Sequence, residues 1–239
     1  MRHIYLIRHG QASFDADDYD QLSALGEKQS RLLGDWLKQS GQTVDQIIIG
    51  GNLRHRQTAQ QCLQQFRSDP HQLPEQDWIL DRGFDEFDHQ EVILKHCSEF
   101  SDFCALKQFL SNQSHPRRTF QLMFNDAMSR WTSGDYDDYS ESWVQFQTRC
   151  RDAFMRLTET KVDEKSHQHY WVFTSGGTIS TLIQAVLGIP DQRIFDLNAS
   201  LINTGVSKLF IGRTQTSLNY LNSPSHLEIH QRPELITYR

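Results

Sequence analysis

The chain has 239 residues and a formal net charge of −6, with a pI near 6.0. This length can bury a substantial core, so we expect one large α/β domain, residues 1–239, that carries an insertion. The acidic balance argues against nucleic acid or an anionic membrane as a partner, because both require a basic face. Any phosphate site must therefore be a local positive pocket.

Targeting signals and cysteine spacing indicate the compartment of the protein. No apolar run approaches the length of a membrane span, and the apolar run near the N-terminus is only four residues long before Arg8. The four cysteines, Cys62, Cys97, Cys104 and Cys150, show no C-x-x-C spacing, which favours ordinary thiols over a metal cluster or a disulfide framework. We expect a soluble, cytoplasmic protein.

The N-terminal stretch predicts the functional edge of the fold. The apolar run Ile4–Ile7 breaks into Arg8, His9 and Gly10, as a buried parallel strand does where it reaches the carboxyl edge of a sheet. Arginine keeps its charge, a neutral imidazole is a nucleophile near pH 7, and glycine lets a ligand approach the backbone. This combination suits chemistry on a phosphate.

The next elements predict a strand, a helix and a second strand. A polar, acidic loop over residues 11–20 precedes a helix capped by Ser23 and stopped at Gly41. Residues 45–49 contain the short β-branched run Ile47–Ile49. Strand, helix and strand in this order argue for a parallel sheet.

A second pair of cations follows that strand. Gly50 and Gly51 turn the chain into a helix that extends to about Phe66 and carries Arg54 and Arg56 in its first turn. A helix N-terminus favours anions, so one of these arginines is expected at the sheet edge. We assign that place to Arg54 and expect Arg56 to be a solvated helix charge.

A third strand is expected at residues 78–80, after a polar link over residues 68–76 that contains proline. Beyond it, Glu86 stands near Phe84 and Phe87. A partly desolvated carboxyl there would have a raised pKa and serve as a proton donor.

These motifs together carry a family resemblance. Leu6–Gly10, then Arg-x-x-Gln-Thr-Ala at residues 54–59, then Phe84–Glu86 resemble the histidine phosphatase superfamily, also called the phosphoglycerate mutase-like family. The resemblance implies that His9 is phosphorylated during catalysis, that Arg8 and Arg54 hold the phosphoryl group, and that Glu86 is the acid. It extends from the N-terminus to Glu86 and resumes near Tyr170.

The middle of the chain, residues 90–165, predicts a helical insertion. Residues 92–110, 120–131 and 142–157 carry apolar side chains at helical intervals, with breaks at residues 114–116 and 132–135. We expect this insertion to cap the sheet edge of a three-layer α/β/α fold with a mostly parallel central sheet. The basic cluster at residues 115–118 is expected to be a solvated turn.

The last third predicts the remaining strands and a second anion site. Residues 170–173 form a strand that leads through Ser175 and Gly176 into a helix ending at Gly188, which is an anion-binding geometry. Further strands are expected within residues 201–211 and at residues 218–221.

Position 175 departs from the family pattern. The resemblance implies a second histidine there, which donates to the phosphoryl oxygens, and this chain has Ser175 instead. Its hydroxyl and backbone amide can still donate, and the sequence leaves open whether His89 or His226 substitutes for the absent ring. Losing a charge-assisted donor forfeits about 1.5 to 3 kcal/mol, or roughly ten- to a hundredfold in rate.

The function predicted from these residues is metal-independent hydrolysis of phosphomonoesters through a phosphohistidine at His9. The ring must be held through its other nitrogen by a backbone carbonyl so that the correct tautomer faces phosphorus. Gly10, Ser13, Ser175 and Gly176 are the predicted substrate-binding residues. The mechanism requires no metal or cofactor, and the partner is a small phosphorylated substrate or a phosphoprotein.

Two alternatives stand beside this prediction. A regulatory protein could keep the phosphate pocket with little or no turnover, which the change at Ser175 would permit. A cofactor-dependent phosphoglycerate mutase ranks lower, because residues 11–20 contain four aspartates and no Lys or Arg, with Asp15 where mutases of this family place an asparagine. The sequence leaves the physiological substrate and the oligomeric state open.

Overall fold

The computed structural model describes residues 1–13, 20–69, 72–159, 168–212 and 215–238. These form two compact units, of which the first comprises Met1–Glu86 with Arg149–Arg239 and the second Phe87–Thr148. The first contains the sheet and the motifs of the predicted phosphate site, and the second is helical. We describe each unit by itself.

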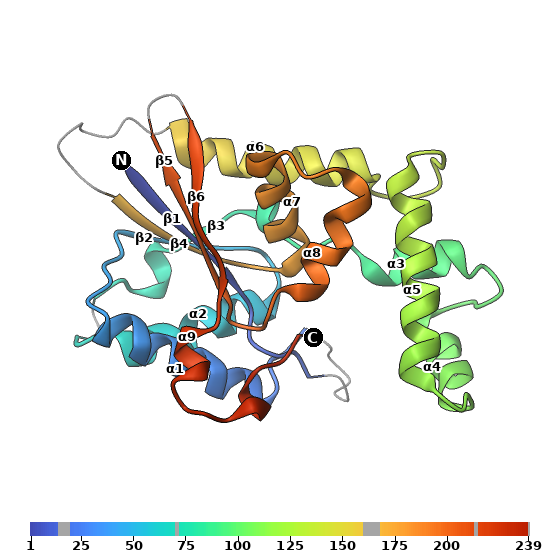
Figure 1. Ribbon diagram of the computed structural model, residues 1–239, viewed down its shortest axis with the longest axis horizontal. Helices are drawn as coiled ribbons and strands as arrows, with labels where there is room; N and C mark the ends of the chain where they lie inside the picture. Colours follow the sequence, from blue (N-terminus) through green and yellow to red (C-terminus); the bar gives the residue numbers. More distant parts are fainter. Residues whose placement is uncertain (14–19, 70–71, 160–167, 213–214, 239) are drawn as a thin grey trace. The chain divides into compact units, whose positions relative to one another are not determined.

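The first unit is built on a mixed sheet whose six described strands have the order β3-β2-β4-β1-β5-β6 (Figure 1). Strands β3, β2, β4 and β1 are parallel to one another, while β5 runs antiparallel to β1 and to β6. The strands are β1 Arg2–Arg8, β2 Gln46–Ile49, β3 Ile79–Leu80, β4 Gln168–Thr174, β5 Val206–Ile211 and β6 Thr216–Ser223. The predicted α/β fold with a mostly parallel central sheet is confirmed.

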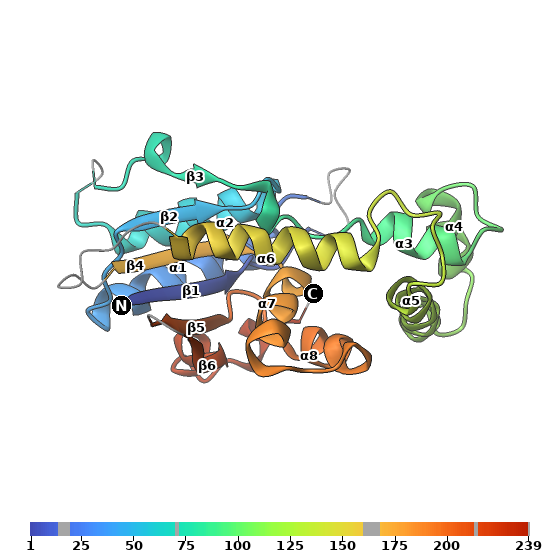
Figure 2. The same ribbon diagram turned by 90° about the horizontal axis from the view of Figure 1, so that it is seen from above.

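Helices lie on both faces of this sheet, α1 and α2 on one and the C-terminal half of α6 on the other (Figures 1 and 2). The helices that contribute to this unit are α1 Ala24–Gln39, α2 Leu53–Phe66, α6 Trp143–Glu159, α7 Gly176–Leu187, α8 Ile194–Ser200 and α9 Ser225–Glu228. Short 3-10 turns occur at Glu75–Asp77, Arg82–Phe84, Asp191–Arg193 and Pro233–Leu235. The described parts of the chain contain no helix with both the length and the apolar character of a bilayer span.

Burial on both faces explains why the strands have continuous apolar runs. Tyr5 and Ile7 of β1 pack with Trp171 and Phe173 of β4 in the core that α1 and α2 cover, while Ile4 is equally buried on the opposite face. Alternate residues of a strand point to opposite faces, so a strand covered on both sides is apolar at every position. The core therefore fixes the sheet whose carboxyl edge carries the motifs.

The second unit contains three helices and the start of α6. They are α3 His89–His96, α4 Phe103–Ser111 and α5 Pro116–Ser133. Its core includes buried rings of Phe87, Trp131, Trp143 and Phe146, with centroids 4.8 to 5.8 Å apart. All four cysteines are free, with Cys104 exposed and Cys62, Cys97 and Cys150 buried.

Several predicted boundaries were wrong for identifiable reasons. The expected helix over residues 92–110 is divided, because Asp102 accepts from the amide of Ala105 at 2.8 Å and starts α4 anew. The helix expected from residue 120 begins already at Pro116, the last residue of the expected break, because proline is favoured at a first helical position. The strand expected from residue 201 begins only at Val206, since residues 202–205 form a turn.

Candidate active site

His9 lies directly after β1 at the carboxyl edge of the sheet, and its backbone is held by three hydrogen bonds. Its amide donates to the carbonyl of Thr174 on β4 at 2.9 Å, and its own carbonyl accepts from Nδ2 of Asn203 at 3.1 Å and from the amide of Thr204 at 3.2 Å. Thr204 has a φ of 58°, a conformation that is strained for a β-branched residue. The strained residue is therefore one of those whose amide groups hold the carbonyl of His9.

The ring of His9 has a defined tautomer. Its Nδ1 lies 2.7 Å from the carbonyl oxygen of Gly10; because a carbonyl only accepts, Nδ1 carries the hydrogen and Nε2 keeps a lone pair. Burial, followed by the charges of Arg54 and Arg8 and the nearby His55, lowers the pKa of His9 well below its usual value, against the bond to Gly10 that raises it. The ring is therefore a neutral imidazole with a nucleophilic Nε2, and the expected backbone carbonyl is present.

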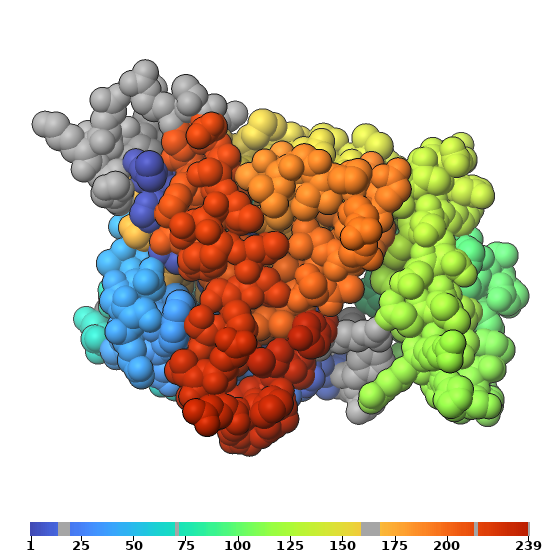
Figure 3. Space-filling model, in the orientation of Figure 1, coloured from blue at the N-terminus to red at the C-terminus, as the bar shows by residue number. Residues whose placement is uncertain are grey.

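Arg8, the last residue of β1, is anchored by backbone carbonyls. Its Nη1 donates to the carbonyl of Leu201 and to that of Tyr238, the latter at 2.9 Å. In the space-filling view, β5, β6 and the segment that follows them form much of the visible surface of the first unit (Figure 3). The C-terminal segment thus reaches the same arginine that lowers the pKa of His9.

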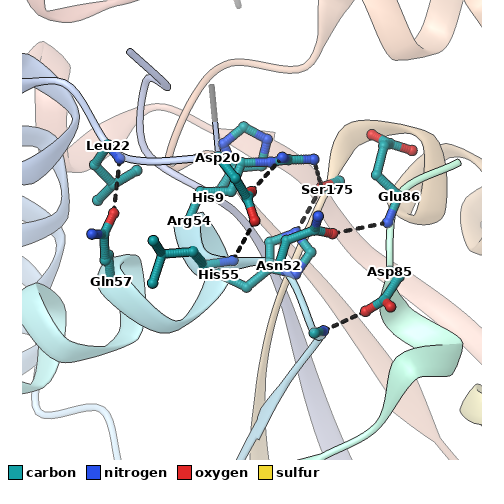
Figure 4. A network of polar contacts seen from close by, with 12 residues as sticks. His9, Asp20, Leu22, Asn52, Arg54, His55, Gln57, Asp85, Glu86 and Ser175 are labelled. Atoms are coloured by element: carbon teal, nitrogen blue, oxygen red, sulfur yellow. Dashed lines mark hydrogen bonds and ion pairs between the residues drawn. The ribbon is translucent and has the colours of Figure 1, made fainter. Parts of the chain in front are cut away.

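Arg54, near the start of α2, is buried beside His9 and paired with Asp20. Its Nη1 lies 2.6 Å from Oδ1 of Asp20, whose Oδ2 accepts from the amide of Leu53 at 2.7 Å. Asn52, the N-cap of α2, makes no side-chain capping bond, so Asp20 provides that acceptor. Figure 4 shows the guanidinium of Arg54 between Asp20 and Ser175.

Arg56 is oriented differently from Arg54. It forms an ion pair with Glu75, and both side chains are about 40 % exposed. The residue two positions along a helix points about 200° away around the axis, since each residue turns by roughly 100°. The structure thus brings Arg54 to His9 and places Arg56 in a surface ion pair.

Ser175 is the N-cap of α7 and is fully buried. Its Oγ lies 2.7 Å from Nε2 of His55 and 3.5 Å from Nη2 of Arg54. Gly176, the first residue of α7, lies against the side chains of Asn198 and Arg8, because a Cβ built there would be 3.5 Å from Cζ of Arg8. Both residues therefore belong to the cluster around the two arginines.

Glu86 lies at the other side of this cluster. Its Oε2 accepts from the amide of Gly177 at the N-terminus of α7 at 3.1 Å, and its amide donates to Oδ1 of Asn52 at 3.4 Å. The neighbouring Asp85 accepts from the amide of Gly51, and burial raises the pKa of Asp85. The loop thus holds two carboxyl groups close to the helix N-termini that border the cluster (Figure 4).

Gly10 and Ser13, two of the predicted substrate-binding residues, both make close contacts within the protein. A Cβ at Gly10 would lie 2.9 Å from Oγ of Ser30 and still closer to the carbonyl of Gly26, so this glycine is required by the close approach of α1. Ser13 donates its amide to the carbonyl of Gln21 at 2.7 Å. Asp15, on which the ranking of the mutase alternative depends, lies outside the described residues.

His55 was missed by the sequence analysis. It occupies the first variable position of the Arg-x-x-Gln-Thr-Ala motif, and the structure buries it completely, with its ring centroid 5.8 Å from that of His9. Burial, then the charge of Arg54, lowers its pKa well below the usual value. The available signal was a histidine next to Arg54 on a helix that was already expected to enter the site.

The two histidines proposed as substitutes are engaged elsewhere or belong to the second unit. Nε2 of His226 lies 2.7 Å from Oγ1 of Thr204, and burial lowers the pKa of His226 to about 3. His89 begins α3 of the second unit. His115, Arg117 and Arg118 are exposed, as expected, but they are the N-cap and first turn of α5 and not a separate turn.

Comparison with known proteins identifies the family. The model of the histidine phosphatase superfamily (branch 1) matches residues 4–99 and 111–224. The chain therefore belongs to the histidine phosphatase superfamily, whose members are phosphatases or mutases. A search of curated proteins found no significant match.

Solved structures share the fold at low sequence identity. Phosphoglycerate mutase from Bacillus anthracis is 15 % identical, with a TM-score of 0.65 over 96 % of each chain. Alpha-ribazole phosphatase from Shigella flexneri is 21 % identical, with a TM-score of 0.60 over 92 % of this chain and 96 % of that one. Phosphoserine phosphatase from Entamoeba histolytica, in complex with 3-phosphoglyceric acid, is 18 % identical, with a TM-score of 0.60 over 95 % and 100 %.

Proposed function

We propose that this chain is a phosphatase that hydrolyses phosphomonoesters through a phosphohistidine at His9. The observation that carries the proposal is the state of the His9 ring, which is neutral, has its Nδ1 hydrogen on the carbonyl of Gly10, and is buried next to two guanidinium groups. A nucleophile with a directed lone pair and fixed positive charge around it matches the needs of phosphoryl transfer.

In the first step, Nε2 of His9 attacks phosphorus, so a P–N bond forms as the P–O ester bond breaks. Glu86 gives its proton to the departing alkoxide, which leaves as the alcohol. Arg8 and Arg54 stabilise the charge on the three equatorial phosphoryl oxygens, where most of the negative charge lies in a loose transition state. No step requires a metal ion, because guanidinium groups supply the positive charge.

In the second step, water attacks the phosphohistidine. The carboxylate of Glu86 takes a proton from the water, the new P–O bond forms and the P–N bond breaks, which releases inorganic phosphate and regenerates neutral His9. The amide of Gly177 that donates to Glu86 stabilises the carboxylate form that this step needs. One residue thus serves as acid and then as base.

The proposed substrate class is a small phosphorylated metabolite, and a phosphoprotein is the alternative. The Entamoeba phosphoserine phosphatase in complex with 3-phosphoglyceric acid supports the first. Comparing kcat/KM on phosphoserine, 3-phosphoglycerate and a phosphoserine peptide decides between the two classes. Isomerisation of 3-phosphoglycerate in the presence of 2,3-bisphosphoglycerate would instead establish a mutase.

The test of the proposal is hydrolysis of an aryl phosphate in the presence of a chelator. We expect turnover that vanadate inhibits, and a loss of at least about 1,000-fold in kcat for His9→Ala, because the nucleophile is removed. Cys104→Ser, an exposed thiol in the second unit, is the control and should keep the wild-type rate.

A phosphate-binding regulatory protein is the second candidate. The serine at position 175 favours it, because the family pattern has a histidine there and a neutral hydroxyl stabilises the transition-state charge less well. Tight binding of phosphate without release of alcohol from any aryl phosphate between pH 4.5 and 7.5 would establish this candidate and exclude the phosphatase.

A further inference from the structure

Ser175 does not act as an ordinary N-cap. A serine at this position normally accepts a hydrogen bond from an amide in the first turn of its helix, but the side chain of Ser175 makes no such bond with α7. Its Oγ instead lies 2.7 Å from Nε2 of His55 and 3.5 Å from Nη2 of Arg54. The hydroxyl is therefore committed to two side chains of α2.

His55 is held tightly between β2 and α7. A Cβ at Gly50, directly after β2, would lie 2.9 Å from Cε1 of His55 and even closer to its Nδ1. Only glycine at position 50 leaves room for this ring. The packing thus fixes the imidazole with Nε2 directed at Ser175, as Figure 4 shows.

Hydrogen bonds connect the side chains of Arg54, Ser175 and His55 in one row. Arg54 only donates, so it needs a lone pair of Oγ. If Nε2 of His55 carries a hydrogen, it donates that hydrogen to the second lone pair of Ser175 Oγ. If Nε2 has no hydrogen, it accepts the hydroxyl hydrogen of Ser175. A lone pair remains for Arg54 in both tautomers, and in both the ring determines the orientation of Oγ.

The same contact excludes a second imidazole. Because Nε2 of His55 is only 2.7 Å from Oγ of Ser175, a ring attached to the Cβ at position 175 would overlap the ring of His55. The space between α2 and the N-cap of α7 therefore accommodates one imidazole, which either element can carry.

We propose that His55 is a positioning residue of the phosphate site, which orients Arg54 through Ser175 and places on α2 the imidazole that the family pattern has at position 175. The proposal rests on the proposed function, since it concerns the same phosphate site. It replaces His89 and His226 as candidates for compensating the change at position 175.

The test moves the imidazole from one element to the other. Four variants are compared with wild type: His55→Phe, His55→Ala, the double variant H55A/S175H and its control H55A/S175F. Each is measured for kcat and KM on an aryl phosphate, for the Kd of inorganic phosphate by calorimetry, and for thermal stability.

We expect His55→Phe and His55→Ala to lower kcat/KM by about 10- to 100-fold, because Arg54 loses a directed partner. Phenylalanine keeps the packing, so its Tm should stay close to wild type. H55A/S175H should recover to within about fivefold of wild type, whereas H55A/S175F, which restores only volume, should not.

Equal recovery by both double variants, or a wild-type rate in His55→Phe, would reduce His55 to a packing residue and overturn the proposal. If His55→Ala does not fold, His55→Phe decides alone by the same criterion. If the wild type shows no turnover at all, the proposed function fails separately, and the same pattern in the Kd of phosphate still decides the role of His55.

Discussion

Arg54 in the first unit and Arg130 in the second each pair with an aspartate, yet the two arginines have different surroundings. Arg130 binds Asp138 through both Nη atoms at 3.0 and 3.1 Å, and the face of its guanidinium covers the ring of Tyr136 at 3.7 Å. Arg54 uses Nη1 for Asp20, while its Nη2 makes a longer contact, 3.5 Å, with Oγ of Ser175.

The electrostatic effects of the two arginines differ as well. Arg54 is buried and lowers the pKa of two neutral imidazoles, His9 and His55, whereas Arg130 mainly affects its own partners Asp138 and Tyr139. An arginine that is held by an aspartate through both Nη atoms and by an aromatic ring contributes to the fold. An arginine with a long contact beside a nucleophile has donors to offer a ligand. Substitution of Arg54 tests whether it binds the phosphoryl group in this way.

The largest effect is expected for Arg54→Met. Removing one of the preorganised donors of a charged transition state typically reduces kcat by about 100- to 1,000-fold. The charge of Arg54 lowers the pKa of His9. Its removal should therefore shift the acid limb of the pH profile of kcat/KM, which in the wild type lies below pH 6.5, to higher pH. Steady-state kinetics between pH 4.5 and 7.5 measure both changes.

Arg130→Met is the matched control for that comparison. We expect kcat/KM within about twofold of wild type and a small decrease in Tm, from the loss of one partly exposed ion pair and one cation–π contact. An activity loss as large as that of Arg54→Met would contradict the distinction between the two arginines.

The next effect concerns stability and comes from His226, whose pKa in the folded protein is about 3. Below pH 6.5 the unfolded chain binds a proton at this residue and the folded protein does not, so stability falls as the pH decreases from 6.5 towards 3. One such histidine contributes about 1.4 kcal/mol per pH unit at most.

His226→Gln should therefore flatten the dependence of the free energy of unfolding on pH by about that amount between pH 6 and 4.5. Urea denaturation at several pH values measures it. A slope equal to that of the wild type would mean that His226 is protonated in the folded state and that its contact with Thr204 is charged.

A smaller effect is expected for Asp20→Asn. The carboxylate of Asp20 competes with a phosphate dianion for Arg54 and repels it, while asparagine keeps an oxygen for the amide of Leu53. We expect the inhibition constant of vanadate to fall by about three- to tenfold. Weaker vanadate binding would show instead that Asp20 holds Arg54 in place for the ligand.

The sequence was sufficient to predict the strands that are buried on both faces and the residues that directly follow them. The runs before His9 and Ser175 are continuous and apolar, and β1 and β4 pair so that Arg8 is opposite Thr174. The sequence therefore identified His9, Arg8, Ser175 and the neighbouring Arg54 as one cluster, because parallel strands end at a common edge.

The remaining features depend on contacts between distant segments. His55 is 120 positions from Ser175, and Asp20 is 34 positions from Arg54, so neither pairing follows from local periodicity. The division between α3 and α4 was missed because apolar spacing continued across residues 97–102 while a capping aspartate restarted the helix. The close approach of α1 to Gly10 was not predicted, because such an approach has no sequence signature.

The most direct test of the central claim is to trap the covalent intermediate. Wild-type protein is mixed with an aryl phosphate, quenched in alkali within one turnover, digested and analysed by mass spectrometry. We predict one phosphoryl group on the peptide that contains His9, formed at least as fast as kcat. A phosphoryl group on Ser175, or turnover with no labelled peptide, would contradict the assignment of His9 as the nucleophile.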